Sequence, residues 1–143
     1  MLYPLGISDA AAMAAIHREA MERSWDEESF SRFLSDPFSV AYGYRERTHL
    51  MAFVLGRQVE EEVEILTLAV DPAYWRQGLG RKVLQYFAEQ LEAKVIFLEV
   101  NEANRPALAL YRSAGFEEDG VRKGYYTTAQ GLKDAILMRK SIA

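Results

Sequence analysis

Residues 76–81 combine two glycines with two arginines, a combination suited to binding phosphate. Arg76 and Arg81 supply positive charge, and Gly78 and Gly80 lack the Cβ atoms that would keep a ligand away from the backbone. Apolar residues recur at helical spacing from position 79 onward, so the turn begins a helix. Because the first N–H groups of a helix have no partner within it and its dipole favours an anion, the sequence predicts a pyrophosphate site here.

A plain glycine turn with two solvated arginines is the alternative, and it would be favoured if the G-x-G stood alone. No Lys-Ser or Lys-Thr follows the glycines, which excludes a P-loop, and a dinucleotide fingerprint would need a third glycine. The segment from Glu64 to Val70 is rich in Ile, Leu and Val and predicts a buried strand that ends at Asp71-Pro72. The turn therefore joins a strand to a helix.

The composition is that of an ordinary globular protein and limits the classes of function. The 143 residues are 50% apolar and 27% charged, which predicts one domain, 1–143, with a proper core. A net charge of −4 argues against a general nucleic-acid binder. Without cysteine there is no disulfide or thiolate nucleophile, and His17 and His49 lie far apart, so we expect no metal site.

The chain gives no sign of targeting to a membrane. A signal peptide would begin with a basic segment and a long apolar run, and no apolar stretch approaches the roughly 20 residues of a membrane span. We expect a cytoplasmic protein, a monomer or weak dimer, with no direct membrane or nucleic-acid partner.

The first half of the chain predicts an edge strand, two helices and three antiparallel strands. Asp26 is expected to cap the second helix, and Trp25 and Phe30 have the spacing of a hydrophobic staple. For Trp25 we favour this packing role over a substrate contact, and we expect His17 to be structural or solvated. The expected elements are an edge strand at Met1–Ile7, helices beginning at Ser8 or Asp9 and at Asp26, and strands at 39–44, 50–59 and 64–70.

The second half contains a carboxylate inside an apolar strand. The run Val95–Val100 is nearly continuous, as expected for a strand buried on both faces, and Glu99 interrupts it. A carboxylate there costs free energy unless it has a partner or a task. Pro106 fits the first turn of the next helix, and Gly115 fits its left-handed cap. Strands at 116–126 and 134–139 complete the expected chain.

The turn resembles the R/Q-x-x-G-x-G/A signature of the GNAT acyltransferase superfamily, through Gln77, Gly80 and their neighbours. Two further pieces agree, namely Leu98-Glu99-Val100 followed by Asn104, and Ala109-Leu110-Tyr111 followed by Gly115-Phe116. The resemblance covers nearly the whole chain. It implies an α/β (α+β) fold with a mixed, mostly antiparallel twisted sheet of about seven strands, about four flanking helices and a splayed cofactor cleft.

The resemblance also implies the residues that bind and react. Acetyl-CoA would donate its acetyl group directly to an amine, with Glu99 as general base and Tyr111 as the general acid for the CoA thiolate. A packed tyrosine is the alternative for Tyr111. The backbone of 68–70 would pair with the pantetheine. The expected cofactor-binding residues are Leu68, Ala69, Val70, Arg76, Gln77, Gly78, Leu79, Gly80, Arg81 and Asn104.

Within the superfamily the chain is most similar to the ribosomal-protein-alanine N-acetyltransferases of the Rim I type. The segments Gly124-Tyr125-Tyr126 and Asp134–Met138 carry this closer match. It implies that the acceptor is the N-terminal α-amine of a protein, the N-terminal alanine of the small-subunit ribosomal protein bS18. Tyr125 and Tyr126 could flank the incoming peptide, or could be sheet-packing aromatics. A GNAT enzyme acting on a small amine or a lysine, and a non-catalytic CoA-binding module, are the alternatives.

Overall fold

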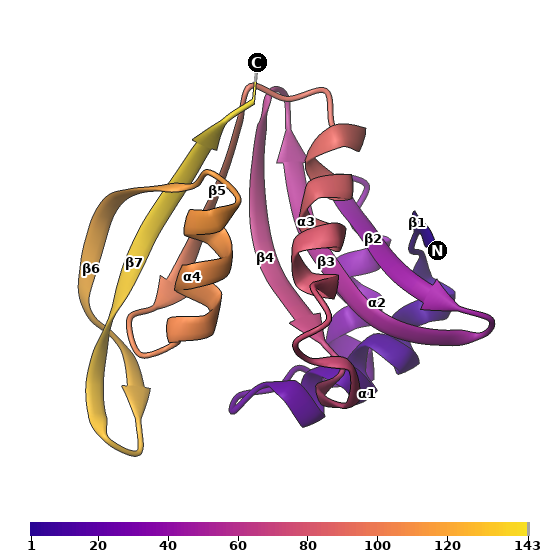
Figure 1. Ribbon diagram of the computed structural model, residues 1–143, viewed down its shortest axis with the longest axis horizontal. Coiled ribbons are helices and arrows are strands. Elements are labelled where there is room, and N and C mark those ends of the chain that lie inside the picture. Colours follow the sequence, from indigo (N-terminus) through magenta and orange to yellow (C-terminus); the bar gives the residue numbers. More distant parts are fainter. Residues whose placement is uncertain (143) are drawn as a thin grey trace.

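A mixed seven-stranded sheet with strand order β1-β2-β3-β4-β5-β7-β6 forms the centre of the computed structural model, which describes residues 1–142 (Figure 1). No helix in this range is long and apolar enough to cross a membrane. The strands are β1 (Leu2–Pro4), β2 (Ser39–Glu46), β3 (His49–Val59), β4 (Glu62–Val70), β5 (Val95–Asn101), β6 (Glu117–Thr128) and β7 (Gly131–Ser141). The helices are α1 (Ala10–Ala20), α2 (Glu27–Ser35), α3 (Leu79–Gln90) and α4 (Arg105–Ser113), with short 3₁₀ turns η1 (Ile7–Asp9) and η2 (Pro72–Tyr74).

The pairing confirms the expected fold class. β1 to β4 form an antiparallel run, β5 pairs with β7 and β7 with β6 in the same manner, and only β4 and β5 are parallel. A long connection through the turn at 76–81 and α3 makes this parallel step possible, because parallel neighbours need a crossover.

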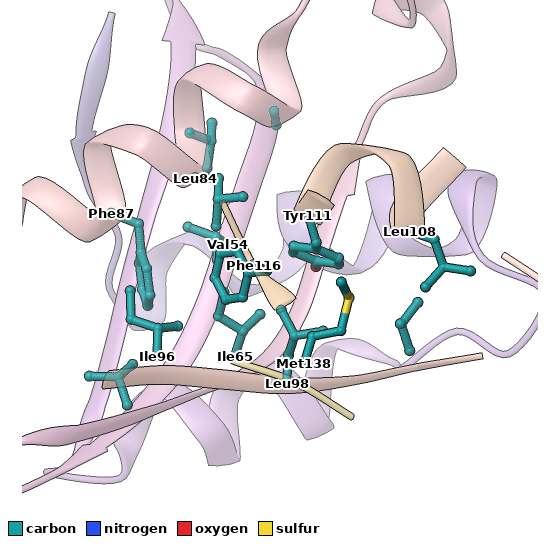
Figure 2. Packing of buried hydrophobic residues seen from close by; sticks show 14 of the residues in the cluster. Val54, Ile65, Leu84, Phe87, Ile96, Leu98, Leu108, Tyr111, Phe116 and Met138 are labelled. Atoms are coloured by element: carbon teal, nitrogen blue, oxygen red, sulfur yellow. The ribbon is translucent and has the colours of Figure 1, made fainter. Parts of the chain in front are cut away.

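Helices cover the two faces of the sheet in different places. Alternation along β3 separates two cores: Ala52 and Val54 pack with residues of α3 and α4, whereas Phe53 and Leu55 pack with residues of α1 and α2. Figure 2 shows the first core, where Phe87 and Leu84 of α3 and the α4 side chains lie over β5 and its neighbours. α1 and α2 contact β2, β3 and β4.

Local signals in the sequence place most helix ends correctly. The Asp26 carboxylate accepts the Ser29 N–H at 2.8 Å, which caps α2 and lowers the Asp26 pKa. Trp25 lies 5.5 Å from Phe30 between ring centroids, which confirms the hydrophobic staple. Gly115 follows α4 with φ of 95°, the left-handed conformation expected of a helix cap.

Three expectations need correction. The first strand is shorter than predicted, since Ile7 lies in η1 and is 56% exposed. Asp9 precedes α1, but its carboxylate accepts the Gly6 N–H instead of capping that helix. β5 is buried on one face only, because α1 and α2 stop at β4 and leave its other face, with Phe97 and Glu99, partly open.

A β-bulge in β4 explains why the sheet splits. Leu55 pairs with Thr67 while Gly56 pairs with Ile65, so Leu66 is an extra residue on β4. The parallel pairing of β4 with β5 comprises three pairs and ends at Glu64 and Phe97. Beyond that point the strands diverge, as Figure 1 shows between β4 and β5, and a cleft lined by residues of both strands confirms the expected splayed cleft.

Gly56→Ala should destabilise the fold beside this bulge. A Cβ at Gly56 would lie 2.8 Å from the Glu64 carbonyl oxygen and 2.8 Å from Cζ of Phe87, so backbone or core must shift. We expect a loss of about 1–3 kcal/mol in the free energy of unfolding, measured by urea denaturation. Gly6→Ala is the matched control, because nothing lies within 4 Å of its Cβ position. Equal stability of the two variants would contradict the close packing described at Gly56.

Candidate active site

The divergence of β4 and β5 opens a cleft of about 690 Å³. Its walls come from the α1–α2 connection, β4, β5, α4 and the β6–β7 hairpin, which are far apart in sequence. It contains seven of the residues predicted from the sequence to bind or react: Trp25, Leu68, Glu99, Asn104, Tyr111, Tyr125 and Tyr126.

The remaining predicted residues lie outside the lining of this cleft. Ala69 and Val70 continue β4 toward the glycine turn, and residues 76–81 form that turn and the start of α3. Gly78 is the residue before α3 and has φ of 75°, which glycine adopts without strain. No side chain caps this helix end, so its first N–H groups remain available to a ligand.

Gly80 has a packing role that the sequence did not reveal. A Cβ built there would lie 3.3 Å from Cδ2 of Leu110 in α4 and 3.5 Å from Cγ2 of Val70. The absence of a side chain therefore lets α3 begin close to α4, in addition to leaving backbone exposed. Arg81 lines a different groove, of about 580 Å³, which it shares with Ser113 and Lys140.

Glu99 and Tyr111 reach the cleft from opposite faces of the sheet. Leu98 and Val100 belong to the core that contains Tyr111, on the side of α3 and α4. Because successive side chains of a strand alternate, Glu99 lies on the other face, and its side chain is 23% exposed. The two groups can therefore act on a ligand that passes through the sheet between β4 and β5.

Tyr111 is both a core residue and a cleft residue. Its ring packs edge-on against Phe116 with centroids 5.5 Å apart, near Met138 and Leu98 (Figure 2). Burial raises the pKa of the Tyr111 hydroxyl well above its usual range, because the phenolate form loses solvation. The hydroxyl therefore keeps its proton at neutral pH, as a proton donor must.

Arg122 is a partner of Glu99 that sequence reasoning missed. Its Nη2 lies 3.0 Å from Oε1 of Glu99, and its guanidinium lies 5.4 Å from the ring centroid of Tyr125. Arg122 is in β6 and Glu99 in β5, with β7 between them, so the long arginine side chain crosses one strand. Only the strand order reveals this neighbourhood, and the sequence carries no local signal for it.

His17 is structural rather than solvated. It is 2% exposed, its Nε2 lies 3.0 Å from Thr67 Oγ1, and its Nδ1 accepts the Trp25 N–H at 2.9 Å. Burial lowers the pKa of His17 to about 4. The Trp25 ring stacks on Phe33 at 4.8 Å, so Trp25 has the packing role that we favoured while also lining the cleft.

Asn104 and Arg23 of the cleft, and Trp75 just before the glycine turn, hydrogen-bond to the backbone. Asn104 accepts the Ala107 N–H at 3.2 Å through Oδ1, which caps α4 and leaves the amide NH₂ group for a ligand. Trp75 donates from Nε1 to the Val70 carbonyl at 2.8 Å. The Arg23 guanidinium donates to the Thr127 carbonyl, which ties the α1–α2 connection to the β6–β7 hairpin across the cleft.

Comparison with known proteins identifies the family of this chain. The Acetyltransferase (GNAT) family matches residues 10–116. The chain belongs to the GNAT acetyltransferase family. Over 142 residues it is 34% identical to the [ribosomal protein bS18]-alanine N-acetyltransferase of Escherichia coli K12, covering 97% of this chain and 95% of the relative. The crystal structure of the E. coli ribosomal-protein-S18-alanine N-acetyltransferase superposes with a TM-score of 0.94, at 33% identity, over 100% of this chain and 94% of the other.

Two other proteins support the assignment to this family. The N-alpha-acetyltransferase RimI of Mycobacterium tuberculosis is 38% identical over 120 residues, which are 81% of this chain and 75% of that protein. Arabidopsis thaliana NAA60 in complex with acetyl-CoA has a TM-score of 0.83 at 20% identity over 99% of this chain and 98% of that one, and so shares the fold. The resemblance inferred from the sequence is confirmed, and the protein is an N-acetyltransferase of the GNAT type.

The buried histidine of this GNAT enzyme should make its stability depend on pH. The pKa of His17 is about 4 in the fold and near 6.5 in the unfolded chain, so the unfolded state binds the proton first as the pH falls. The contribution of neutral His17 to the free energy of unfolding is present above its unfolded pKa of about 6.5 and is lost as the pH falls toward 4. Urea unfolding at pH 7 and pH 4.5 should show about 2–3 kcal/mol more loss in the wild type than in His17→Phe. The same pH dependence in both proteins would contradict the assignment.

Proposed function

We propose that this protein acetylates the N-terminal α-amine of a protein from acetyl-CoA, and that its acceptor is the N-terminal alanine of ribosomal protein bS18. The observation that carries the proposal is the end-to-end similarity to the E. coli enzyme of that name, which spans 97% of the chain. The placement of Glu99 and Tyr111 on one cleft supports it. We also propose that the enzyme acts as a monomer or weak dimer in the cytoplasm, as expected from the sequence.

Acetyl-CoA would enter from the face that carries α3 and α4. The edge of β4 that faces the gap has no strand partner beyond Glu64, so the backbone of Leu68, Ala69 and Val70 can pair with the pantetheine as with an added strand. The free N–H groups at the start of α3, with the arginines of the 76–81 turn, suit the pyrophosphate. The Asn104 amide would bind the CoA arm through its NH₂ group.

The acceptor amine would enter from the opposite face, where Glu99 lies. Trp25, Tyr125 and Tyr126 line that end of the cleft and would flank the peptide. Burial and the negative charge of Glu99 raise the pKa of Tyr126, so its hydroxyl stays neutral and can hydrogen-bond to the peptide. An α-amine has a pKa near 7.7–8.0 and a lysine amine one near 10.4, so an α-amine is far more often in the neutral, reactive form.

The reaction would be a direct transfer. The neutral amine nitrogen attacks the thioester carbonyl carbon and forms the C–N bond, while Glu99 accepts the proton that the nitrogen loses. The C–S bond then breaks, and Tyr111 donates its proton to the leaving CoA sulfur. Backbone N–H groups of the β4 edge are available to bind the oxygen that becomes negative.

Peptide mass spectrometry tests the proposed acceptor. The protein is incubated with acetyl-CoA and a peptide that begins with alanine and contains an internal lysine. Three controls are the same peptide with a blocked N-terminus, free amino acids and a polyamine. We expect one acetyl group on the α-amine. Acetylation of the small amines without any peptide product would contradict the proposal and support a small-amine transferase.

Glu99→Gln should slow turnover by roughly 10²–10⁴-fold at neutral pH, because the amide keeps the shape but accepts no proton. The residual rate should rise with pH as more of the α-amine becomes neutral without help. Steady-state kinetics from pH 6.5 to 9 measures both effects, and acetyl-CoA affinity serves as the control for folding. Near-normal turnover of the variant at pH 7 would remove Glu99 from the role of base.

Tyr111→Phe should also slow turnover, but with a different pH profile. The ring and its packing on Phe116 are kept, and only the hydroxyl that protonates the thiolate is lost. Raising the pH supplies no proton, so the defect of this variant should persist across the range in which Glu99→Gln recovers. Calorimetry should show unchanged acetyl-CoA affinity. Near-normal turnover of Tyr111→Phe at every pH would instead indicate a purely packing role.

A further inference from the structure

His17 and Thr67 form a buried polar pair beside the cleft that the proposed reaction leaves unused. They are 2% and 8% exposed, and both line the cleft. Buried polar groups cost free energy unless they are hydrogen-bonded, and their mutual bond of 3.0 Å lessens that cost. The pair joins α1 to β4 at the first residue after the bulge.

The hydrogen bonds fix where the histidine proton lies. The backbone N–H of Trp25 donates a hydrogen bond to Nδ1 of His17, so Nδ1 carries no hydrogen. Because burial lowers the pKa of His17 to about 4, the ring is neutral at pH 7 and its one N–H is at Nε2. His17 therefore donates to Thr67, and the threonine oxygen is the acceptor in their bond.

This leaves the hydroxyl hydrogen of Thr67 free. A hydroxyl has one hydrogen to donate and two lone pairs, and His17 occupies one lone pair. Within residues 1–142 the Thr67 hydroxyl donates to no protein acceptor. A ligand in the cleft can supply that acceptor.

The face of the sheet on which Thr67 lies indicates whether its hydroxyl contacts the acceptor or the CoA arm. The Thr67 side chain lies on the face that carries α1, because its partner is His17 of α1. Glu99 lies on this same face, whereas Tyr111 and the start of α3 lie on the other. The Thr67 hydroxyl therefore faces the acceptor rather than the CoA arm.

We propose that the Thr67 hydroxyl donates a hydrogen bond to the backbone carbonyl oxygen of the acceptor's first residue, and that His17 positions this hydroxyl. The inference rests on the proposed function. The amine of an N-terminal residue is itself a donor toward Glu99, and the nearest acceptor on that residue is its carbonyl oxygen. A lysine side chain or a polyamine carries methylene groups at that place. Thr67 thus favours protein α-amines over lysine side chains and polyamines.

The test compares two acceptors in wild type and Thr67→Val. One acceptor is an alanine-initiated peptide, and the other has a trans carbon–carbon double bond in place of its first peptide bond, which keeps the shape but removes the carbonyl oxygen. Thr67→Val should raise KM for the normal peptide roughly 3- to 10-fold, the effect of one neutral hydrogen bond, with kcat little changed. It should not change KM for the alkene peptide.

Two more variants separate binding from folding. Thr67→Ser keeps the hydroxyl and should restore the wild-type KM. His17→Phe keeps Thr67 but removes its partner, and should raise KM for the normal peptide alone. Thermal unfolding and acetyl-CoA affinity of each variant report on the fold independently of the acceptor.

The outcomes distinguish this inference from the proposed function. Peptide acetylation by the wild type, with an equal loss in Thr67→Val on both acceptors or no loss on either, overturns the inference alone. A fall in kcat on both acceptors would assign the hydroxyl to the thioester instead and also overturns it. If the wild type acetylates no peptide, the proposed function fails and the inference fails with it.

Discussion

The parallel pairing of β4 with β5 ends after three residue pairs, and the cleft between the two strands depends on that ending. A sheet that continued to pair would be closed and would offer no path from one face to the other. The extra residue Leu66 bends β4 away and reverses the side-chain alternation beyond it. Two strand edges then face a gap, and no strand of the described residues pairs with them there.

Different residues of the cleft lie on the two faces of the sheet. On the face of α3 and α4 lie the uncapped start of α3 and the buried, protonated Tyr111. On the face of α1 lie Glu99 with Arg122, and His17 with Thr67. Donor and acceptor would approach from opposite sides, so neither needs to leave before the other enters, and the acetyl group would be transferred within the sheet itself.

Local signals in the sequence made much of the fold predictable. The strand-turn-helix at 76–81, the cap at Asp26 and the left-handed Gly115 depend on neighbours in sequence, and all are found as expected. The cleft and its lining by Glu99 and Tyr111 came from the family resemblance. Arg122 and the His17–Thr67 pair were missed because they depend on strand order and helix packing, and the one-sided burial of β5 depends on where α1 and α2 end.

Because the parallel pairing of β4 with β5 is short, bound acetyl-CoA would also stabilise the fold. Between its two parts, β1–β4 and β5–β7, the sheet is continuous through three backbone pairs alone, with side chains of the α3 and α4 core bridging the rest. A molecule that pairs with the β4 edge inside the cleft would bind the folded chain and not the unfolded one, and at 100 times its dissociation constant it would add about 2.7 kcal/mol to stability. The resistance of this protein to local opening and to proteolysis in the cell would then follow the supply of acetyl-CoA.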